Sequence, residues 1–182
     1  MLEPLLSADE TLLRLVLSWP HPAWLNWLMQ AASYAGVGGG IWLAMGLALT
    51  LMRAIRFSDF VRLVIAIALV HLVVDVLIKP TIGRVRPPLA MPDLSIGVDV
   101  PESKSFPSGH AANAVAAAFV LHRLSRRARP IVWTAAAIVV VARVYLGVHY
   151  PLDALAGSLV GLLCGWVVLL VHEEKRGGQT AV

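Results

Sequence analysis

The feature that most constrains this chain is a series of long apolar blocks separated by short polar segments. Leu, Val, Ala and Ile follow one another in these blocks without the spacing of an amphipathic helix or strand. Of the 182 residues, 58% are hydrophobic and only 14% are charged, whereas soluble domains carry about a quarter charged residues. The pattern predicts an integral membrane protein. We expect its spans to be helices, because open strands in lipid leave backbone polar groups unsatisfied.

Five blocks are long enough, or nearly long enough, to cross a bilayer, which takes ~20 apolar residues in a helix. We place them at Val37–Met52, Val61–Ile78, Ala111–Leu124, Ile131–Val148 and Leu152–Val171. The first and third blocks are short and are expected to extend outward by a few residues. The predicted fold class is an all-α polytopic membrane bundle of five to six transmembrane helices, built as one domain over residues 1–182.

Residues 1–36 are expected to form an interfacial segment or a broken first helix. Arg14 and the Pro-His-Pro sequence at residues 20–22 interrupt an otherwise apolar stretch. Four of the six tryptophans lie within the first 42 residues, and tryptophan favours the membrane interface. One alternative is an interfacial helix, a bend and a second helix that enters the bilayer. The other alternative is a sixth, broken span.

Basic residues in the connecting segments predict the orientation of the bundle. If five spans alternate, three basic groups share one side: Arg53, Arg56 and Arg62; Arg123, Arg126, Arg127 and Arg129; Lys175 and Arg176. The positive-inside rule assigns that side to the cytoplasm. Residues 79–109 then form an extracytoplasmic loop, which also carries Lys79, Arg84, Arg86 and Lys104. We attribute these further cations to a site. Because the basic residues are split among short loops, no nucleic-acid partner is expected.

Three polar clusters fall on this predicted outer side. The first is KPTIGRVRPP, in which six residues separate Lys79 from Arg86. Pro80 and Gly83 lie between them, so the chain can fold back and bring the two cations together. The alternative is that both side chains reach the lipid headgroups and have no further role.

The second cluster is SFPSGH, just before an apolar block. Ser108 is a natural N-cap, Gly109 lets a ligand approach the backbone, and His110 falls in the first helical turn. The free N–H groups and the positive end of the helix dipole make such a helix start an anion site. The alternative is an ordinary capped helix with an incidental histidine.

The third cluster is ARVYLGVHYPLD. Arg143 lies inside an apolar block, which is costly unless it faces a cavity or a partner. His149 falls in a short turn, and Asp153 follows four residues later, close enough to hold the imidazole in one tautomer. The alternative is an interfacial His–Asp pair beside an arginine that reaches the headgroups.

Together the three clusters supply enough hydrogen-bond donors to surround a tetrahedral oxyanion. Phosphate is the obvious candidate, because the paired N–H groups of an arginine side chain match its oxygens. No set of Asp, Glu and His resembles a metal cage, and the single cysteine, Cys164, cannot form a thiolate metal site. We therefore expect no metal and no cofactor, with the protein itself supplying the positive charge.

The order and spacing of these motifs resemble the type 2 phosphatidic acid phosphatase superfamily of membrane lipid phosphatases. The family pattern is K-x6-R-P, then P-S-G-H, then S-R-x5-H-x3-D, and this chain has KPTIGRVRP, PSGH and ARVYLGVHYPLD. The motifs run from Lys79 to Asp153. One position departs from the pattern: Ala142 stands where the family has serine, which removes one hydroxyl but no catalytic group.

The resemblance implies a role for each motif residue. His149 would be the nucleophile that forms a phosphohistidine, Asp153 its orienting carboxylate, and His110 the general acid. The phosphate cradle would comprise Lys79, Arg86, Ser108, Gly109 and Arg143. Two histidines suit the task, since one can be neutral and the other protonated near neutral pH.

The expected partner is a lipid phosphate in a bacterial inner membrane, with the active site facing the periplasm. The candidate substrates are undecaprenyl diphosphate, phosphatidylglycerol phosphate, phosphatidic acid and the phosphates of lipid A. We favour undecaprenyl diphosphate or a broad-range hydrolase; a lipid A phosphatase or a phosphotransferase is the alternative. A competing function of another class is a membrane protein that binds or transports phosphate lipids without hydrolysis.

Asp75 lies outside the family motifs. Its spacing from Lys79 and His71 is four residues each way, which places the three side chains on one helix face. Because a carboxylate in a membrane helix is costly unless paired, we expect Asp75 to hold the Lys79 ammonium toward phosphate. The alternative is an Asp75 carboxylate hydrated near the headgroups.

Overall fold

The computed structural model describes residues 2–93, 100–124, 126 and 129–177, and within these ranges the regular elements are all helical. The prediction of an all-α fold is confirmed. In chain order the elements are α1 (Leu2–Leu17), α2 (Ala23–Ala35), η1 (Val37–Gly39), α3 (Gly40–Leu51), α4 (Phe57–His71), η2 (Leu72–Ile78), α5 (Lys79–Ile82), α6 (Pro87–Ala90), α7 (Gly109–Leu124), α8 (Arg129–Tyr145) and α9 (Pro151–Gly177).

The centre of the bundle is α7, against which α4, α8 and α9 pack. Its alanines from Ala111 to Ala118 are fully buried, and such small side chains let neighbouring helices come close. On α9, a Cβ added to Gly161 would lie 2.3 Å from the Ala112 carbonyl oxygen of α7, and one added to Gly157 would lie 2.3 Å from the carbonyl oxygen of Ser108, just before α7. Glycine is therefore required where α9 crosses α7.

The predicted number of five to six membrane spans is supported only in part. The apolar helical run Phe57–Ala90 and the segment Pro151–Val171 are each long and apolar enough to cross a bilayer, and α2 with α3 makes a third if counted as one bent span. Helices α7 and α8 have only 16 and 17 residues, respectively. Because these two are short, five to six full spans are not confirmed among the described residues.

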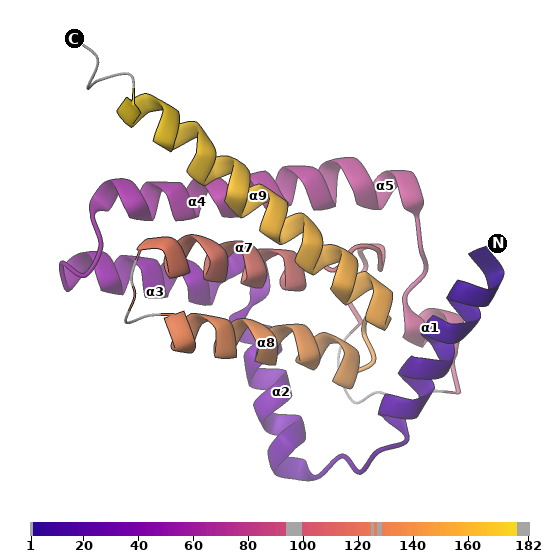
Figure 1. Cartoon of the computed structure of the whole chain (residues 1–182). Coiled ribbons are helices and arrows are strands. Elements are labelled where there is room, and N and C mark those ends of the chain that lie inside the picture. The colour runs from indigo at the N-terminus through magenta and orange to yellow at the C-terminus, as the bar shows by residue number, and fades with distance from the viewer. Residues whose placement is uncertain (1, 94–99, 125, 127–128, 178–182) are drawn as a thin grey trace.

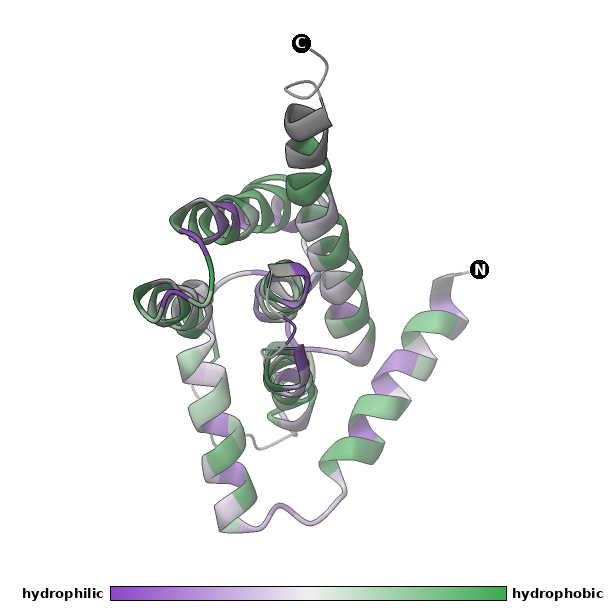
Figure 2. Ribbon diagram, turned by 60° about the vertical axis from the view of Figure 1, so that its left-hand side comes forward, coloured by the Kyte–Doolittle hydropathy of each residue, from purple (hydrophilic) through white to green (hydrophobic). Residues whose placement is uncertain are grey.

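Two helices, α1 and α2, precede the predicted span at Val37–Met52. Helix α1 stands apart from the main bundle and is joined to α2 by the Pro-His-Pro segment (Figure 2). Helices α2 and α3 meet at a bend of 59°. Gly38 and Gly39 adopt φ values of 57° and 78° there, a left-handed conformation that glycine adopts without steric cost. The predicted span at Val37–Met52 is thus the second half of a broken helix pair.

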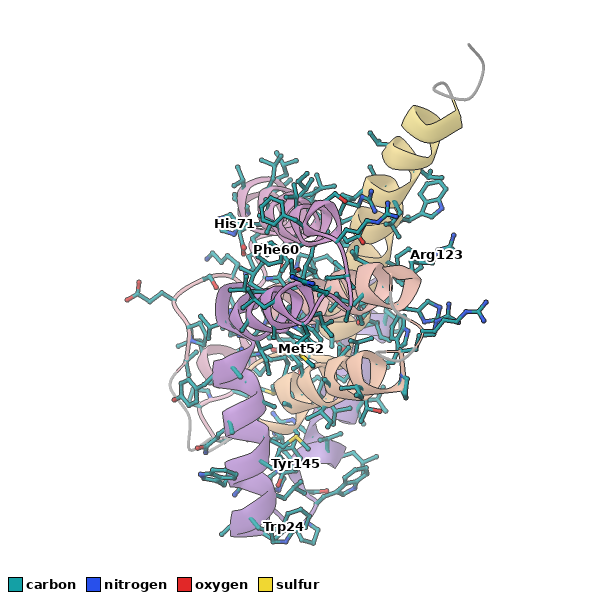
Figure 3. The ribbon with its side chains drawn as sticks, turned by 90° about the vertical axis from the view of Figure 1, so that its left-hand side faces the viewer. Trp24, Met52, Phe60, His71, Arg123 and Tyr145 are labelled. Atoms are coloured by element: carbon teal, nitrogen blue, oxygen red, sulfur yellow. The ribbon has the colours of Figure 1, made fainter. Side chains whose placement is uncertain are left out.

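An apolar surface covers the outside of the bundle. On α9, Leu155, Leu159 and Leu163 recur at helical spacing and are each about three-fifths exposed. At the far end of α2, Trp24 points outward from the protein (Figure 3). Large exposed apolar side chains around a helical bundle are the surface that lipid covers.

The helix ends and the connections between helices gather at two opposite ends of the bundle. The α3–α4 connection, the end of α7, the start of α8 and the end of α9 lie at one end (Figure 1, left). The start of α7, the end of α8, the start of α9 and α5 gather at the other end (Figure 1, right). Within the predicted loop 79–109, residues 94–99 lie outside the described residues, as does Arg127 of the basic group between α7 and α8.

Candidate active site

The turn between α8 and α9 carries His149. Gly147 has φ 67°, which reverses the chain after Tyr145, and the His149 N–H donates to the carbonyl of Arg143 at 3.2 Å. The predicted fourth span, Ile131–Val148, therefore ends early as a helix, because its last residues form this turn. The imidazole of His149 is almost completely buried at 1% exposure.

The two ring nitrogens of His149 have different partners. Nε2 lies 3.0 Å from an Arg86 guanidinium nitrogen, which can only donate, so Nε2 accepts. Nδ1 then carries the proton and faces Asp153 Oδ2 at 3.4 Å. Burial lowers the pKa of His149 to about 3, and the Asp153 carboxylate offsets only part of that effect. The structure thus holds a neutral imidazole whose lone pair is on Nε2.

Asp153 is fully buried in the first turn of α9, and both its oxygens are engaged. Oδ2 accepts from the Ser105 hydroxyl at 2.5 Å and from the Tyr150 N–H at 3.0 Å. Oδ1 accepts from Arg84 at 2.7 Å. The short i, i+4 spacing to His149 was visible in the sequence, but Arg84 and Ser105 were not predicted as partners.

Arg86 enters the site from the segment between α5 and α6 and is 3% exposed. Its Nε donates to the Ser103 carbonyl at 2.6 Å, and one terminal nitrogen donates to the Ser103 hydroxyl at 2.9 Å. The other terminal nitrogen contacts the Val148 carbonyl at 2.9 Å as well as His149. These contacts fix the guanidinium plane against the imidazole.

Lys79 and the start of α7 meet at the same place. Lys79 Nζ pairs with Asp75 Oδ1 at 2.6 Å, and Asp75 Oδ2 lies 2.7 Å from His71 Nδ1. A Cβ added to Gly109 would lie 3.7 Å from both Lys79 Nζ and Asp75 Oδ1, so the ammonium adjoins the helix start. Residues 72–78 form a π-helical turn rather than the α-helix assumed from the spacing, yet the three side chains remain in contact. His71 itself lies at the periphery (Figure 3).

Ser108 immediately precedes α7, as expected of an N-cap. Its hydroxyl lies 3.5 Å from the Ala111 N–H, and its own N–H donates to the Asp153 carbonyl oxygen at 2.9 Å. The second contact ties the start of α7 to the start of α9. The start of α7 and the carboxylate at the start of α9 therefore share one corner.

His110 and Arg143 line a cavity of about 90 Å³ that also borders Ser33, Tyr34 and Val148. Arg143 donates to the Ser33 hydroxyl. The Nε2 of His110 and the Nε of Arg143 are buried and find no hydrogen-bond partner in the described part of the chain. Two buried polar atoms therefore belong to residues that line one small cavity, where a polar group can satisfy both.

All of the predicted site residues therefore gather at one end of the bundle. Two further residues join them that the sequence did not identify, Asp9 of α1 and Ser105. Arg84 joins them too, a loop cation that the sequence attributes to a site without naming its partners. Among the residues that the structure describes, no group of three or more His, Cys, Asp or Glu side chains is arranged to hold a metal ion.

Comparison with known proteins identifies the family and the fold. The model of the PAP2 superfamily matches residues 59–176, which include every motif described above. The chain belongs to the PAP2 superfamily. One of its structural relatives is a transmembrane phosphatase, and large apolar side chains cover the outside of its helices. The chain is therefore an integral membrane protein.

Two curated relatives illustrate the range of the family. The decaprenylphosphoryl-5-phosphoribose phosphatase of Mycobacterium tuberculosis is 37% identical over 95 residues, covering 52% of this chain and 51% of that protein. The chain thus matches about half the length of that relative. The lipid A 4'-phosphatase of Bacteroides thetaiotaomicron is 29% identical over 186 residues, covering 93% of this chain and 79% of that protein.

Two solved structures share the architecture. LpxE of Aquifex aeolicus superimposes with a TM-score of 0.75 and 29% identity, covering 87% of this chain and 93% of the other. A PAP2-type phosphatidylglycerolphosphate phosphatase from Bacillus subtilis gives a TM-score of 0.74 and 28% identity, covering 94% and 87%, respectively.

Proposed function

We propose that the protein is a metal-independent lipid phosphatase that removes a terminal phosphate from a lipid phosphate or diphosphate. The observation that carries the proposal is the pairing at His149. Its Nε2 is an acceptor beside the Arg86 cation, and its Nδ1 faces the buried Asp153. This is the arrangement of a neutral nucleophile held next to a phosphate-binding group.

In the first step, His149 Nε2 attacks phosphorus and the bond from phosphorus to the leaving oxygen breaks. The leaving alkoxide, or leaving phosphate, takes a proton from His110. Asp153 stabilises the positive charge that develops on the ring by accepting from Nδ1–H. The product of this step is a phosphohistidine and a lipid that has lost its terminal phosphate.

In the second step, His110 accepts a proton from water, and the resulting oxygen attacks the phosphohistidine. The P–N bond breaks, its electron pair returns to Nε2, and inorganic phosphate leaves. Lys79, Arg86, Arg143 and the start of α7 balance the charge on the equatorial oxygens throughout, and phosphoryl transfer depends mainly on such positioning and charge stabilisation.

The position of the site supports a lipid substrate. The residues gather at the end of the apolar bundle rather than at mid-depth, so a lipid can present its phosphate there while its chains remain in the bilayer (Figure 1). A transporter places polar groups near the bilayer midplane. We assign the site to the periplasmic face of a bacterial inner membrane, because the opposite end carries the basic connections.

For the substrate we propose the undecaprenyl diphosphate or phosphatidylglycerol phosphate type. The polyprenyl-linked substrate named for the mycobacterial relative and the phosphatidylglycerolphosphate phosphatase from Bacillus subtilis support this class. A lipid A phosphatase or phosphotransferase is the second candidate. It is favoured by the long match to the Bacteroides lipid A 4'-phosphatase, which covers most of both chains.

The test is phosphate release from a panel of these lipids by detergent-purified protein in EDTA. We expect release from at least one lipid, and an acid-labile, base-stable phosphoenzyme under rapid quench. His149→Ala should abolish turnover and leave the fold intact, with His122→Ala as the matched control, because His122 lies at the other end of α7. Phosphate release by His149→Ala at the wild-type rate would refute the nucleophile. A wild-type protein that binds these lipids without releasing phosphate would favour the binding or transport alternative.

A further inference from the structure

The N-terminal helix contributes a buried charge to the site. Asp9 of α1 is 1% exposed, and Leu13, one turn later on the same face, is fully buried. Leu13 packs against Met91 and Tyr150 next to the turn that carries His149. A helix that otherwise stands apart from the bundle (Figure 2) is thus attached at the active-site corner by apolar and ionic contacts.

The two oxygens of Asp9 have separate partners. Oδ1 accepts from the Leu152 N–H at 2.9 Å, which satisfies a free donor in the first turn of α9. Oδ2 pairs with Arg84 at 2.7 Å. The other terminal nitrogen of Arg84 pairs with Asp153 Oδ1, also at 2.7 Å, and the guanidinium lies 3.8 Å over the Tyr150 ring.

Arg84 therefore divides its fork between two fully buried carboxylates. Burying either carboxylate without a cation would be costly, so the single guanidinium compensates both. The division also has a geometric consequence. Because one nitrogen is held by Asp9, Arg84 reaches only Oδ1 of Asp153, and Oδ2 stays available to Ser105, Tyr150 N–H and His149.

We propose that Asp9 and Arg84 are a positioning pair through which α1 holds Asp153, and hence the tautomer of His149, in place for catalysis. The proposal rests on the proposed function for the role of His149. Without the Asp9 charge, the Arg84 fork can pair with both oxygens of Asp153, the geometry that guanidinium and carboxylate prefer. Oδ2 would then be shared with Arg84, and the Nδ1–H of His149 would lose its acceptor.

The first test compares Asp9→Asn with Glu10→Gln. Asparagine has the same size as aspartate and can keep its oxygen toward the Leu152 N–H, so the change removes the charge and the acceptor that face Arg84. Glu10 is the next residue on α1, and its carboxylate makes an exposed pair with Arg14. We expect Asp9→Asn to lower kcat ~10- to 100-fold, the range for residues that orient a reacting ligand. KM and the inhibition constant of inorganic phosphate should stay within about two-fold, since the phosphate cradle is untouched. Glu10→Gln should match the wild type in all three.

The second test is a double-variant cycle with Arg84→Met. If the pair acts as one unit, Asp9→Asn should lower kcat much less in the Arg84→Met background than in the wild type. Additive losses would show that Asp9 acts independently of Arg84. If Arg84→Met does not fold, the Asp9→Asn comparison still decides, with thermal unfolding measured on every variant. A lower melting temperature with unchanged kcat per folded molecule would make the pair a structural clamp and overturn the proposal.

The third readout needs no substrate. In protein with ¹⁵N-labelled histidine, the signals of His149 can be assigned by their loss in His149→Ala. We expect a neutral ring protonated on Nδ1 in the wild type and in Glu10→Gln, and a shifted tautomer balance in Asp9→Asn. If the wild type releases no phosphate from any lipid, the proposed function fails while this comparison still tests the coupling. Identical His149 signals in Asp9→Asn and wild type would refute the positioning pair.

Discussion

Gly157 sits where a single methyl group would separate the two halves of the site. A Cβ at this position would lie 2.3 Å from the Ser108 carbonyl oxygen and 3.1 Å from its carbon. Both atoms belong to the backbone, so no side-chain rotation relieves the contact. To reach the ~3.5 Å of an ordinary van der Waals contact, the start of α7 would have to move from α9 by about 1 Å.

Such a movement acts directly on the chemistry. Ser108 precedes α7, and Gly109 and His110 lie in its first turn. The start of α9 carries Asp153, and the two helix starts are joined by the 2.9 Å bond from the Ser108 N–H. A misplacement of ~1 Å between reacting groups can cost about 100-fold in rate. We therefore expect Gly157→Ala to lower kcat/KM by about 100-fold. Over-packing of this kind also costs about 1–3 kcal/mol of stability.

Two glycines further along α9 provide the controls. A Cβ at Gly161 would make the same 2.3 Å contact, now with the Ala112 carbonyl oxygen one turn deeper in the bundle. A Cβ at Gly165 would lie 3.2 Å from the Ala116 carbonyl oxygen and from the Phe119 ring, a strain that small adjustments relieve. Gly161→Ala should match Gly157→Ala in lost stability with a smaller loss of activity, and Gly165→Ala should affect both least.

The assay is phosphate release from the lipid that the wild type hydrolyses best, with thermal unfolding of each variant in the same detergent. The comparison separates helix spacing at the site from general destabilisation. Wild-type kcat/KM in Gly157→Ala would refute the reasoning. So would an equal activity loss in all three variants, because the effect would then follow stability rather than distance from the site.

Two further predictions concern the pair of Asp75 with Lys79 and the orientation of the protein in the membrane. Asp75→Asn should lower kcat/KM by ~10-fold or more, because the Lys79 ammonium loses its 2.6 Å partner, and the loss should be strongly non-additive with Lys79→Ala; full activity, or simple additivity, would contradict it. A cysteine at Arg123 should react with a membrane-impermeant reagent only from the cytoplasm, and one at Glu102 only from outside. The reverse sidedness would overturn the periplasmic site.

The sequence predicts those features of the molecule that are local in the chain. Long apolar blocks imply helices in lipid, and the four-residue spacings of His149 with Asp153 and of Asp75 with Lys79 become direct contacts, because each pair lies within one turn. The motif order predicts that distant segments meet, since a shared anion is the simplest reason for so many donors. Each of these inferences needs only the geometry of a helix or the chemistry of phosphate.

The residues that escaped prediction act across long separations. Asp9 meets Arg84 75 positions away, and Ser105 meets Asp153 48 positions away. An acidic residue in an amphipathic helix such as α1 normally faces water, so nothing near Asp9 indicates that it is buried. The span count has a related cause. Hydropathy identifies apolar blocks but not where a helix stops, and α8 stops at Tyr145 because the following turn must place His149.

The contact between Arg86 and His149 implies an order of events in the proposed reaction. While Nε2 accepts from Arg86, its lone pair is engaged and cannot attack phosphorus. The other two nitrogens of Arg86 are held by Ser103, so the guanidinium need not leave when phosphate arrives. A phosphate oxygen is a stronger acceptor than a neutral imidazole, because the bond to it joins two charges. Binding of the substrate therefore transfers one Arg86 donor from the nucleophile to the phosphate, and the same exchange that fixes the phosphate frees the atom that attacks it.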